Sequence, residues 1–201
     1  MNNIKIILAS ASPRRKELLT QIGVKFDVMV SDKETDIDSS NPVKACEKQA
    51  MQKALDIEEK AALKYKEDYI IIAADTIVAL EDTILGKPKD KEDARLMLER
   101  ISGKKHKVYT AVCVFNSRLK TQESFVEETT VEVAELSKED IDFYLSKDEA
   151  YDKAGAYAIQ GLFSRYIVGI EGDYYNVMGL PVGRVYREHL AGSVGEQKFR
   201  S

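Results

Sequence analysis

The segment over residues 4–22 constrains the fold more than any other part of the chain. It passes from an apolar run at Ile4–Leu8, through a Ser-Pro break at residues 12–13, into apolar residues with helical spacing. A nearly continuous apolar run is typical of a strand covered on both faces. A strand followed closely by a helix is the building unit of α/β proteins. We therefore expect an α/β fold with this strand in its sheet.

The same junction has the features of an anion-binding site. A helix that opens directly after a strand directs unpaired backbone N–H groups, and the positive end of its dipole, to one place. Arg14 and Arg15 add guanidinium groups whose forked donors suit phosphate oxygens. Ser12 is a natural helix cap and Pro13 fits the first helical position. An ordinary capped helix with its arginines in solvent therefore also explains these residues.

The rest of the chain continues the alternation of strand and helix patterns. Residues 69–74 have the strongest buried-strand signal, and we expect this strand to end at Asp75 and Thr76, before a hairpin through Glu81 and Asp82. No internal repeat or low-complexity linker divides the chain, so the pattern predicts one α/β unit of two lobes over residues 1–190 and a polar tail over 191–201. The other expected elements are strands at 26–30, 108–115, 124–136 and 166–170, and helices at 13–22, 42–66, 90–101, 141–145 and 177–190, the fourth with a capping box at Ser137 and Asp140.

Composition and charge exclude several kinds of partner. The chain of 201 residues has a net charge of −4, which gives no electrostatic footprint for nucleic acid or an anionic membrane, so a small anion bound at a local site fits better. No segment approaches the ~18 apolar residues of a membrane span, and the N-terminus has no leader pattern. Cys46 and Cys113 are far apart and form no metal-binding spacing. We expect neither a disulfide nor a zinc site, and a reducing, cytoplasmic location.

Two carboxylates are candidates for chemistry. Asp75 follows the most apolar strand, where open α/β sheets place their ligands and where a carboxylate can bind a metal ion or orient water. The alternative is a structural turn cap together with Thr76. Glu34 lies in an acidic loop, for which a solvated surface is the plainer interpretation.

Several side chains could bind phosphate or a base. Lys87 lies in a Gly-Lys-Pro sequence that suits a phosphate contact, although an ordinary surface turn explains it as well. Lys53 lies in the long helix, where solvent-facing lysines are common. Lys153 precedes a stretch of small residues that permits close backbone approach. The amide of Gln160 both donates and accepts, so it can recognise the edge of a base or only brace its own loop.

The signatures of covalent catalysis are absent from the sequence. It contains no Walker A motif, no Gly-x-Gly-x-x-Gly after the first strand and no Gly-x-Ser-x-Gly. His106 and His189 make no metal motif with each other, and structural roles are favoured for both. Cations, two carboxylates and a helix N-terminus are the parts needed for metal-assisted attack of water on a polyphosphate.

Six sequence blocks follow one another over about residues 4–190. They are LASASPRRKELL at 8–19, ADTIV at 74–78, GKPKD at 86–90, Ser102-Gly103 with His106, KAGAYAIQG at 153–161 and GDYYNVMGLP at 172–181. In this order the blocks resemble the Maf family of nucleoside triphosphate pyrophosphatases. The resemblance implies the Maf/Ham1 architecture, a mixed α/β fold with a long twisted sheet flanked by helices and a central cleft between two lobes. It also implies hydrolysis of a nucleoside triphosphate to the monophosphate and pyrophosphate with a divalent metal, Mg²⁺ or Mn²⁺, and a possible homodimer.

The resemblance also implies roles for individual residues. Asp75 would be the general base, and Glu34 and Asp75 would hold the metal. Arg14, Thr76 and Gln160 match positions associated with substrate choice. The remaining positions that would line the phosphate and metal site are Ser12, Arg15, Lys53 and Lys87.

The pattern of Asp-Thr after the central strand, together with Ile-Gln-Gly at 159–161, resembles the branch that acts on dTTP, UTP and modified pyrimidine nucleotides and removes non-standard nucleotides. Two alternatives stay open. One is a nucleotide-binding regulator of cell division without turnover. The other is a pyrophosphatase with a preference for 7-methyl-GTP and CTP, or for inosine and xanthosine triphosphates.

Overall fold

The computed structural model describes residues 4–31, 33, 41–81 and 83–193. Three sequence expectations, for Glu34, for Asp82 and for the tail from residue 194 onwards, fall outside these residues. The helices are α1 (Pro13–Gln21), α2 (Pro42–Lys64), α3 (Lys91–Ile101), α4 (Lys138–Leu145), α5 (Tyr174–Met178) and α6 (Val182–Val185), with short 3₁₀ turns η1 (Ala154–Ala156) and η2 (Leu162–Tyr166) and a π-helical turn η3 (Tyr186–Leu190). The strands are β1 (Lys5–Leu8), β2 (Asp27–Val28), β3 (Tyr69–Leu80), β4 (Thr83–Leu85), β5 (Lys105–Asn116), β6 (Thr121–Val133) and β7 (Ile167–Glu171).

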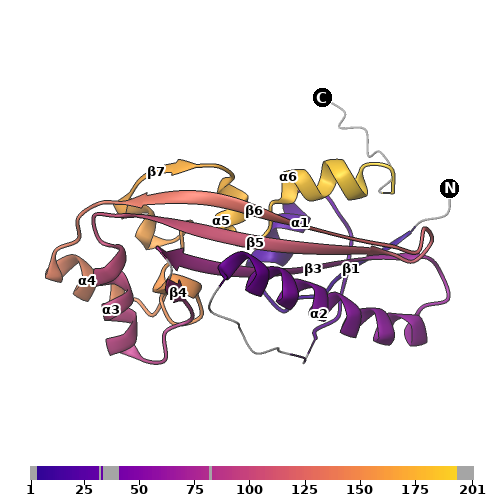
Figure 1. Ribbon diagram of the computed structural model, residues 1–201, viewed down its shortest axis with the longest axis horizontal. Coiled ribbons are helices and arrows are strands. Elements are labelled where there is room, and N and C mark those ends of the chain that lie inside the picture. The colour runs from indigo at the N-terminus through magenta and orange to yellow at the C-terminus, as the bar shows by residue number, and fades with distance from the viewer. Residues whose placement is uncertain (1–3, 32, 34–40, 82, 194–201) are drawn as a thin grey trace.

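One mixed sheet of seven strands organises the molecule. Its order is β2-β1-β3-β5-β6-β7, and β4 pairs with β3. β1 runs parallel to β2 and β3, whereas the pairs from β3 through β5 and β6 to β7 are antiparallel. The long strands β3, β5 and β6 run the length of the molecule, with α3 and α4 at one end (Figure 1). This mixed α/β sheet flanked by helices confirms the expected fold class.

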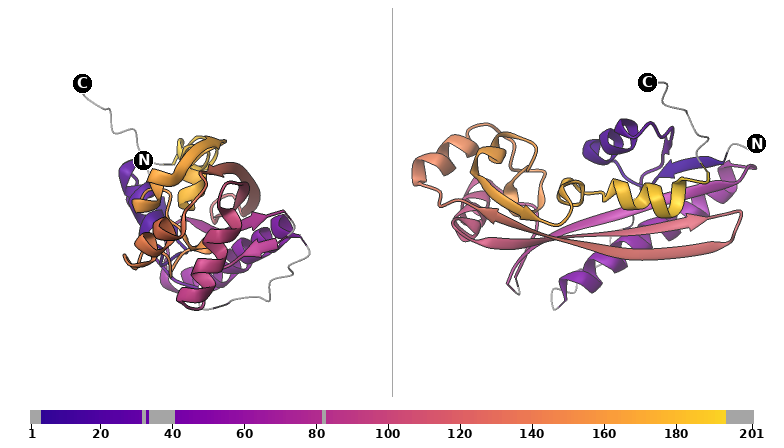
Figure 2. Two further views of the ribbon diagram at one scale, coloured as in Figure 1. Left: turned by 90° about the vertical axis from the view of Figure 1, so that its left-hand side faces the viewer. Right: turned by 90° about the horizontal axis from the view of Figure 1, so that it is seen from above.

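Helices cover the two faces of the sheet, and each face has its own apolar core. Figure 2 shows α2 on one face of the long strands and α1 and α6 on the other. α2 packs through small side chains, including Ala50 and Ala54, against Ile71 and Ala73 of β3. The opposite face carries the larger core, in which Ile70 and Ile72 of β3 meet Leu18 and other apolar residues. Alternate residues of β3 therefore face different helices, as the two-residue period of a strand requires.

The structure corrects the predicted end of the central strand. β3 does not stop at Asp75 and Thr76 but continues to Leu80, because the antiparallel strand β5 pairs with it from Ile70 to Ala79. The expected hairpin follows, since β4 pairs with Val78–Leu80. The strand that the sequence placed at 26–30 is only Asp27–Val28, and the one placed at 124–136 begins earlier, at Thr121, and ends at Val133.

The predicted closing helix over residues 177–190 is also wrong as a single element. α5 ends at Met178, and Gly179 adopts φ +113°, a left-handed conformation that favours glycine and ends the helix. Pro181 then leads into α6, and the last turn is π-helical. By contrast, the capping box is confirmed: Asp140 N donates to Ser137 Oγ, and Ser137 N donates to Asp140 Oδ2.

Three side chains of the core, those of Cys46, Cys113 and His106, carry titratable groups into an apolar interior. Cys46 and Cys113 are both buried and free. His106 is buried on β5, and its Nε2 lies 2.7 Å from the hydroxyl of Tyr157. Among the described residues, no group of three or more His, Cys, Asp or Glu side chains could hold a metal ion. Within the same residues, no helix is both long enough and apolar enough to cross a membrane.

Burial of His106 makes stability depend on pH. It lowers the pKa of His106 from 6.5 to about 4, so the folded protein keeps the ring neutral where the unfolded chain protonates it. The free energy of unfolding is therefore highest above pH 6.5. It falls by about 3 kcal/mol as the pH decreases from 6.5 towards 4, because only the unfolded chain binds the proton readily in this range. Urea unfolding of wild type and of His106→Gln, at about pH 7 and about pH 4.5, measures this loss. Equal pH dependence in the two proteins would contradict the assignment.

Candidate active site

An uncovered stretch along one edge of β3 positions the site. β1 pairs with β3 from Tyr69 to Ile72 and then ends. β4 pairs from Val78 onwards and must lie on that same edge, because β5 occupies the other. Between these neighbours, no described strand covers the edge of β3 at residues 73–77. The sequence placed the ligand beyond the end of β3. The structure has such a position, but it lies beyond the end of β1, while β3 continues past it.

A cavity of about 400 Å³ opens over this uncovered edge. Asp75 and Thr76 are successive residues of β3, so their side chains leave the strand on opposite faces, yet both reach the cavity at the open edge. All eight predicted site residues that the structure describes line this one cavity: Ser12, Arg14, Arg15, Lys53, Asp75, Thr76, Lys87 and Gln160. Glu34 is the one predicted site residue outside the described part of the chain.

The cavity is cationic although the chain as a whole is anionic. Five cationic side chains line it, against two carboxylates, Asp75 and Asp152. The net charge of the whole chain is −4. Positive charge gathered in a concave site raises the local concentration of anions, so this cavity favours a multiply charged anionic ligand. The cations are Arg14, Arg15, Lys53, Lys87 and Lys153.

Asp75 and Lys53 form an ion pair on the α2 side of the cavity. Lys53 Nζ lies 2.6 Å from Asp75 Oδ1, and the two side chains are 22% and 20% exposed. The second oxygen, Oδ2, has no hydrogen-bond partner among the described residues. A carboxylate that is positioned by one oxygen and open at the other is suited to orient a water molecule or to bind a metal ion.

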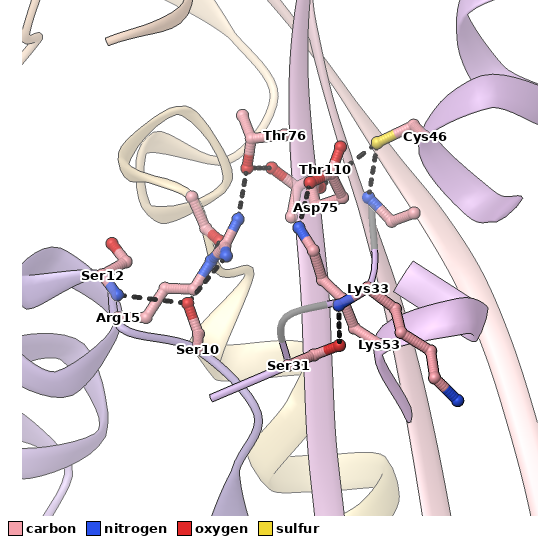
Figure 3. A network of polar contacts seen from close by, with 12 residues as sticks. Ser10, Ser12, Arg15, Ser31, Lys33, Cys46, Lys53, Asp75, Thr76 and Thr110 are labelled. Carbon is pink, nitrogen blue, oxygen red and sulfur yellow. Dashed lines mark hydrogen bonds and ion pairs between the residues drawn. The ribbon is translucent and has the colours of Figure 1, made fainter. Parts of the chain in front are cut away.

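Cys46 contacts the backbone of Asp75 and does not line the cavity. Its thiol donates to the backbone oxygen of Asp75 at 3.2 Å and accepts from Ala111 N at 3.3 Å (Figure 3). Burial raises the pKa of the thiol to about 12, so it stays protonated at neutral pH. This agrees with the absence of covalent-catalysis signatures in the sequence.

Arg15 is buried rather than free in the cleft, which distinguishes it from its neighbour Arg14. Its Nε donates to Gly179 O at 2.7 Å, and its terminal nitrogens donate to Ser10 Oγ and Thr76 Oγ1, each at 3.0 Å (Figure 3). Burial lowers the pKa of Arg15. Three of the five guanidinium N–H groups are thus used to join α1, β3 and the end of α5, and two remain for a ligand.

Ser12 occupies the predicted cap position but does not cap the helix with its side chain. The structure has Ser12 at the N-cap of α1 and Pro13 in the first turn, without a side-chain cap hydrogen bond. Instead Ser12 N donates to Ser10 Oγ at 3.2 Å. The expected capping role is therefore wrong, and the hydroxyl of Ser12 stays available at the wall of the cavity.

Sequence reasoning missed the counter-ion of Arg14. Arg14 Nη1 lies 3.4 Å from Asp152 Oδ2, and Asp152 also pairs with Lys153. Burial alone would raise the pKa of Asp152, but the ion pairs with Lys153 and Arg14 lower it. The available signal was that Asp152 directly precedes Lys153, the first residue of the block at 153–161.

Lys87 and Gln160 reach the cavity from two loops. Lys87 follows β4, and the neighbouring Gly86 accepts a hydrogen bond from Gly155 N at 3.0 Å, which ties this loop to η1. Both side chains are exposed, as residues that meet a ligand from solvent would be. The structure therefore assembles the predicted cluster from segments that are far apart in the sequence.

The fold and the cavity together define an α/β protein with a cationic cleft at the open edge of a mixed sheet. The chain belongs to the Maf family, since the family model described as "Maf-like protein" matches residues 5–190. It is 49% identical over 195 residues to the dTTP/UTP pyrophosphatase of Agathobacter rectalis. This alignment covers 92% of the present chain and 95% of the relative. The dTTP/UTP pyrophosphatases of Carboxydothermus hydrogenoformans and Bacillus thuringiensis subsp. konkukian are 46% and 47% identical, over 92% of this chain and over 97% and 93% of their own lengths.

Proposed function

We propose that this protein hydrolyses dTTP and UTP to the nucleoside monophosphate and pyrophosphate. The observation that carries the proposal is the meeting of eight predicted residues in one cationic cavity, with Asp75 at its centre on the open edge of β3. The relatives named dTTP/UTP pyrophosphatases, which match the chain over almost its full length, support the same reaction.

In the proposed reaction, water attacks the α-phosphorus and pyrophosphate leaves. Asp75 Oδ2 accepts a proton from the attacking water, while Lys53 holds the other carboxylate oxygen in place. Negative charge grows on the departing pyrophosphate as the bond to the α-phosphorus breaks. Arg14, Lys87 and Lys153 supply positive charge for it from the cavity wall.

A divalent metal, Mg²⁺ or Mn²⁺, fits the donor set of this cavity. Mg²⁺ is commonly held by one or two carboxylates, with water and substrate phosphates filling its other positions. Asp75 supplies one such carboxylate, and the sequence proposes Glu34 as a second. When bound, the metal would polarise the phosphoryl oxygens and offset their charge.

A nucleotide panel tests this function. Purified protein is incubated with dTTP, UTP, CTP, 7-methyl-GTP and inosine triphosphate, and the release of pyrophosphate is measured with Mg²⁺, with Mn²⁺ and with EDTA. We expect pyrophosphate and the monophosphate from dTTP and UTP, and loss of turnover in EDTA. Release from inosine triphosphate or 7-methyl-GTP instead would identify a different substrate class. Binding of intact triphosphate without turnover would identify a regulator.

A further inference from the structure

A partly buried chain of hydroxyl groups runs from β3 to β5 on one face of the sheet, next to the cavity. Thr76 Oγ1 accepts from a terminal nitrogen of Arg15 at 3.0 Å and lies 2.9 Å from Thr110 Oγ1 (Figure 3). Thr110 is fully buried on β5, and its hydroxyl lies 3.0 Å from the backbone oxygen of Asn176. Thr110 itself does not line the cavity, whereas Thr76 does.

The partners at the two ends of this chain determine the direction of every hydrogen bond in it. Asn176 offers Thr110 a carbonyl oxygen, which can only accept, so Thr110 must use its single proton there. The bond between the two threonine hydroxyls must then be donated by Thr76. Arg15 can only donate. Thr76 therefore donates its only hydroxyl hydrogen to the bond with Thr110. Towards a ligand, its oxygen can act only as a hydrogen-bond acceptor, through the remaining lone pair.

An oxygen that can only accept selects the groups it can bind. Phosphate oxygens at neutral pH have no proton to give to Thr76, so a phosphate is a poor partner for it. Uracil and thymine, once attached to the sugar, have one ring donor, the imide N3–H. Cytosine has no proton at N3 and presents a lone pair there, so it would meet the lone pair of Thr76 unfavourably.

The surroundings of Thr76 suit a base better than a phosphate. Val78 follows on the same face of β3, and Val108 is its partner on β5, as Thr110 is the partner of Thr76. Both valines line the cavity, together with Met178 of α5. Asp75 lies on the opposite face of β3, where Lys53 of α2 pairs with it. The open edge thus separates an apolar part of the cavity from the carboxylate proposed for catalysis.

We propose that Thr110 is a positioning residue for base selection. By accepting a hydrogen bond from Thr76, it leaves that hydroxyl oxygen as an acceptor for the N3–H shared by uracil and thymine. The proposal rests on the proposed function, because it concerns which pyrimidine nucleotide the same cavity accepts. Thr110 touches neither the ligand nor the reacting atoms, so its removal should change selectivity without removing turnover.

Three substitutions separate this role from a structural one. Thr110→Val keeps the shape but removes the oxygen, which frees the Thr76 proton to donate to cytosine N3, whereas Thr110→Ser keeps the oxygen. Thr129→Val is the matched control, because Thr129 is equally buried and braces Asn176 and Asp173 without contacting Thr76. The ratio of kcat/KM for UTP to that for CTP is measured for each. We expect Thr110→Val to lower this UTP-to-CTP ratio about tenfold, mainly through changes in the KM values. Thr110→Ser and Thr129→Val should leave the ratio unchanged.

A modified substrate tests the same contact from the ligand side. UTP methylated at N3 has no imide proton, so wild type should hydrolyse it poorly, and Thr110→Val should show a smaller difference between it and UTP. Thermal unfolding reports whether each variant is folded, and Thr110→Ala removes the same oxygen with less bulk if the valine variant does not fold.

The outcomes distinguish this inference from the proposed function. An unchanged ratio in Thr110→Val, an equal loss in Thr129→Val, or equal use of UTP and its N3-methyl form overturns the role of Thr110. Equal hydrolysis of UTP and CTP by the wild type would also overturn the role of Thr110, but it would leave the proposed pyrophosphatase function intact. Wild type that releases no pyrophosphate from UTP or dTTP overturns the proposed function itself.

Discussion

Replacement of Asp75 by Asn is expected to lower kcat for pyrophosphate release from UTP by roughly 10²–10⁴-fold. The amide has nearly the same size as the carboxylate but cannot take a proton from water. It also leaves Lys53 without the ion pair that now holds it at 2.6 Å. Removing a negative charge from a cationic cavity does not weaken attraction of the triphosphate, so KM should stay equal or fall. Initial rates over a range of UTP concentrations, at saturating Mg²⁺, separate the two constants.

Asp68→Asn is the matched control for this experiment. Asp68 directly precedes the same strand and forms an ion pair with Arg118, but it does not line the cavity. Its substitution makes the same chemical change at the far end of β3 and should leave kcat near wild type. If Asp75→Asn kept kcat within about tenfold of wild type, Asp75 would not be the base, since removal of a general base costs more than this.

Replacement of Arg15 by Met is expected to have the largest effect on stability. It removes three hydrogen bonds and leaves the buried oxygens of Gly179, Ser10 and Thr76 with one donor fewer. Because these hydrogen bonds come from a buried charged group, their loss should lower the free energy of unfolding by about 3 kcal/mol. For a chain of this length that corresponds to a fall of roughly 6–12 °C in Tm, which thermal unfolding followed by circular dichroism measures.

Arg14→Met makes the same change one residue earlier in α1. Arg14 is 25% exposed and pairs at 3.4 Å with Asp152, which is 65% exposed. An ion pair of this kind contributes about 0–1 kcal/mol, so Tm should fall by only a few degrees at most. Equal losses of Tm in the two variants would show that Arg15 is not the buried link between α1, β3 and α5.

The pattern of apolar residues predicted most of the fold because it reflects local physics. The run at Ile4–Leu8 and the stronger run at residues 69–74 both form strands of the sheet, and the helix at 90–101 is present as α3. The errors occur where a distant partner decides. β3 continues through Asp75 because β5, some thirty residues later in the chain, pairs with it. The division of the closing helix is the exception, because its cause is local: Gly179 adopts a left-handed conformation and Pro181 then leads into α6.

The site shows the same division. Residue type and order along the chain identified the members of the cleft, from Ser12 to Gln160, because family motifs keep the chemistry of each position. The difference between Arg14 and Arg15 was not visible, since both are arginines at the start of one helix. Helical spacing turns adjacent residues about 100° apart, so Arg15 enters the core while Arg14 remains at the cleft.

The sequence by itself therefore determined the α/β class, the family and eight of the residues that meet in the cleft. Only the tertiary structure decided that the cleft lies at the uncovered edge of β3, that Arg15 is a buried link and that Asp152 is the counter-ion of Arg14. It also decided the direction of the hydrogen bonds through Thr76 and Thr110. The physical reason is that a hydrogen bond depends on which groups face each other in space, and residues such as Thr76, Thr110 and Asn176 become neighbours only when the strands pair.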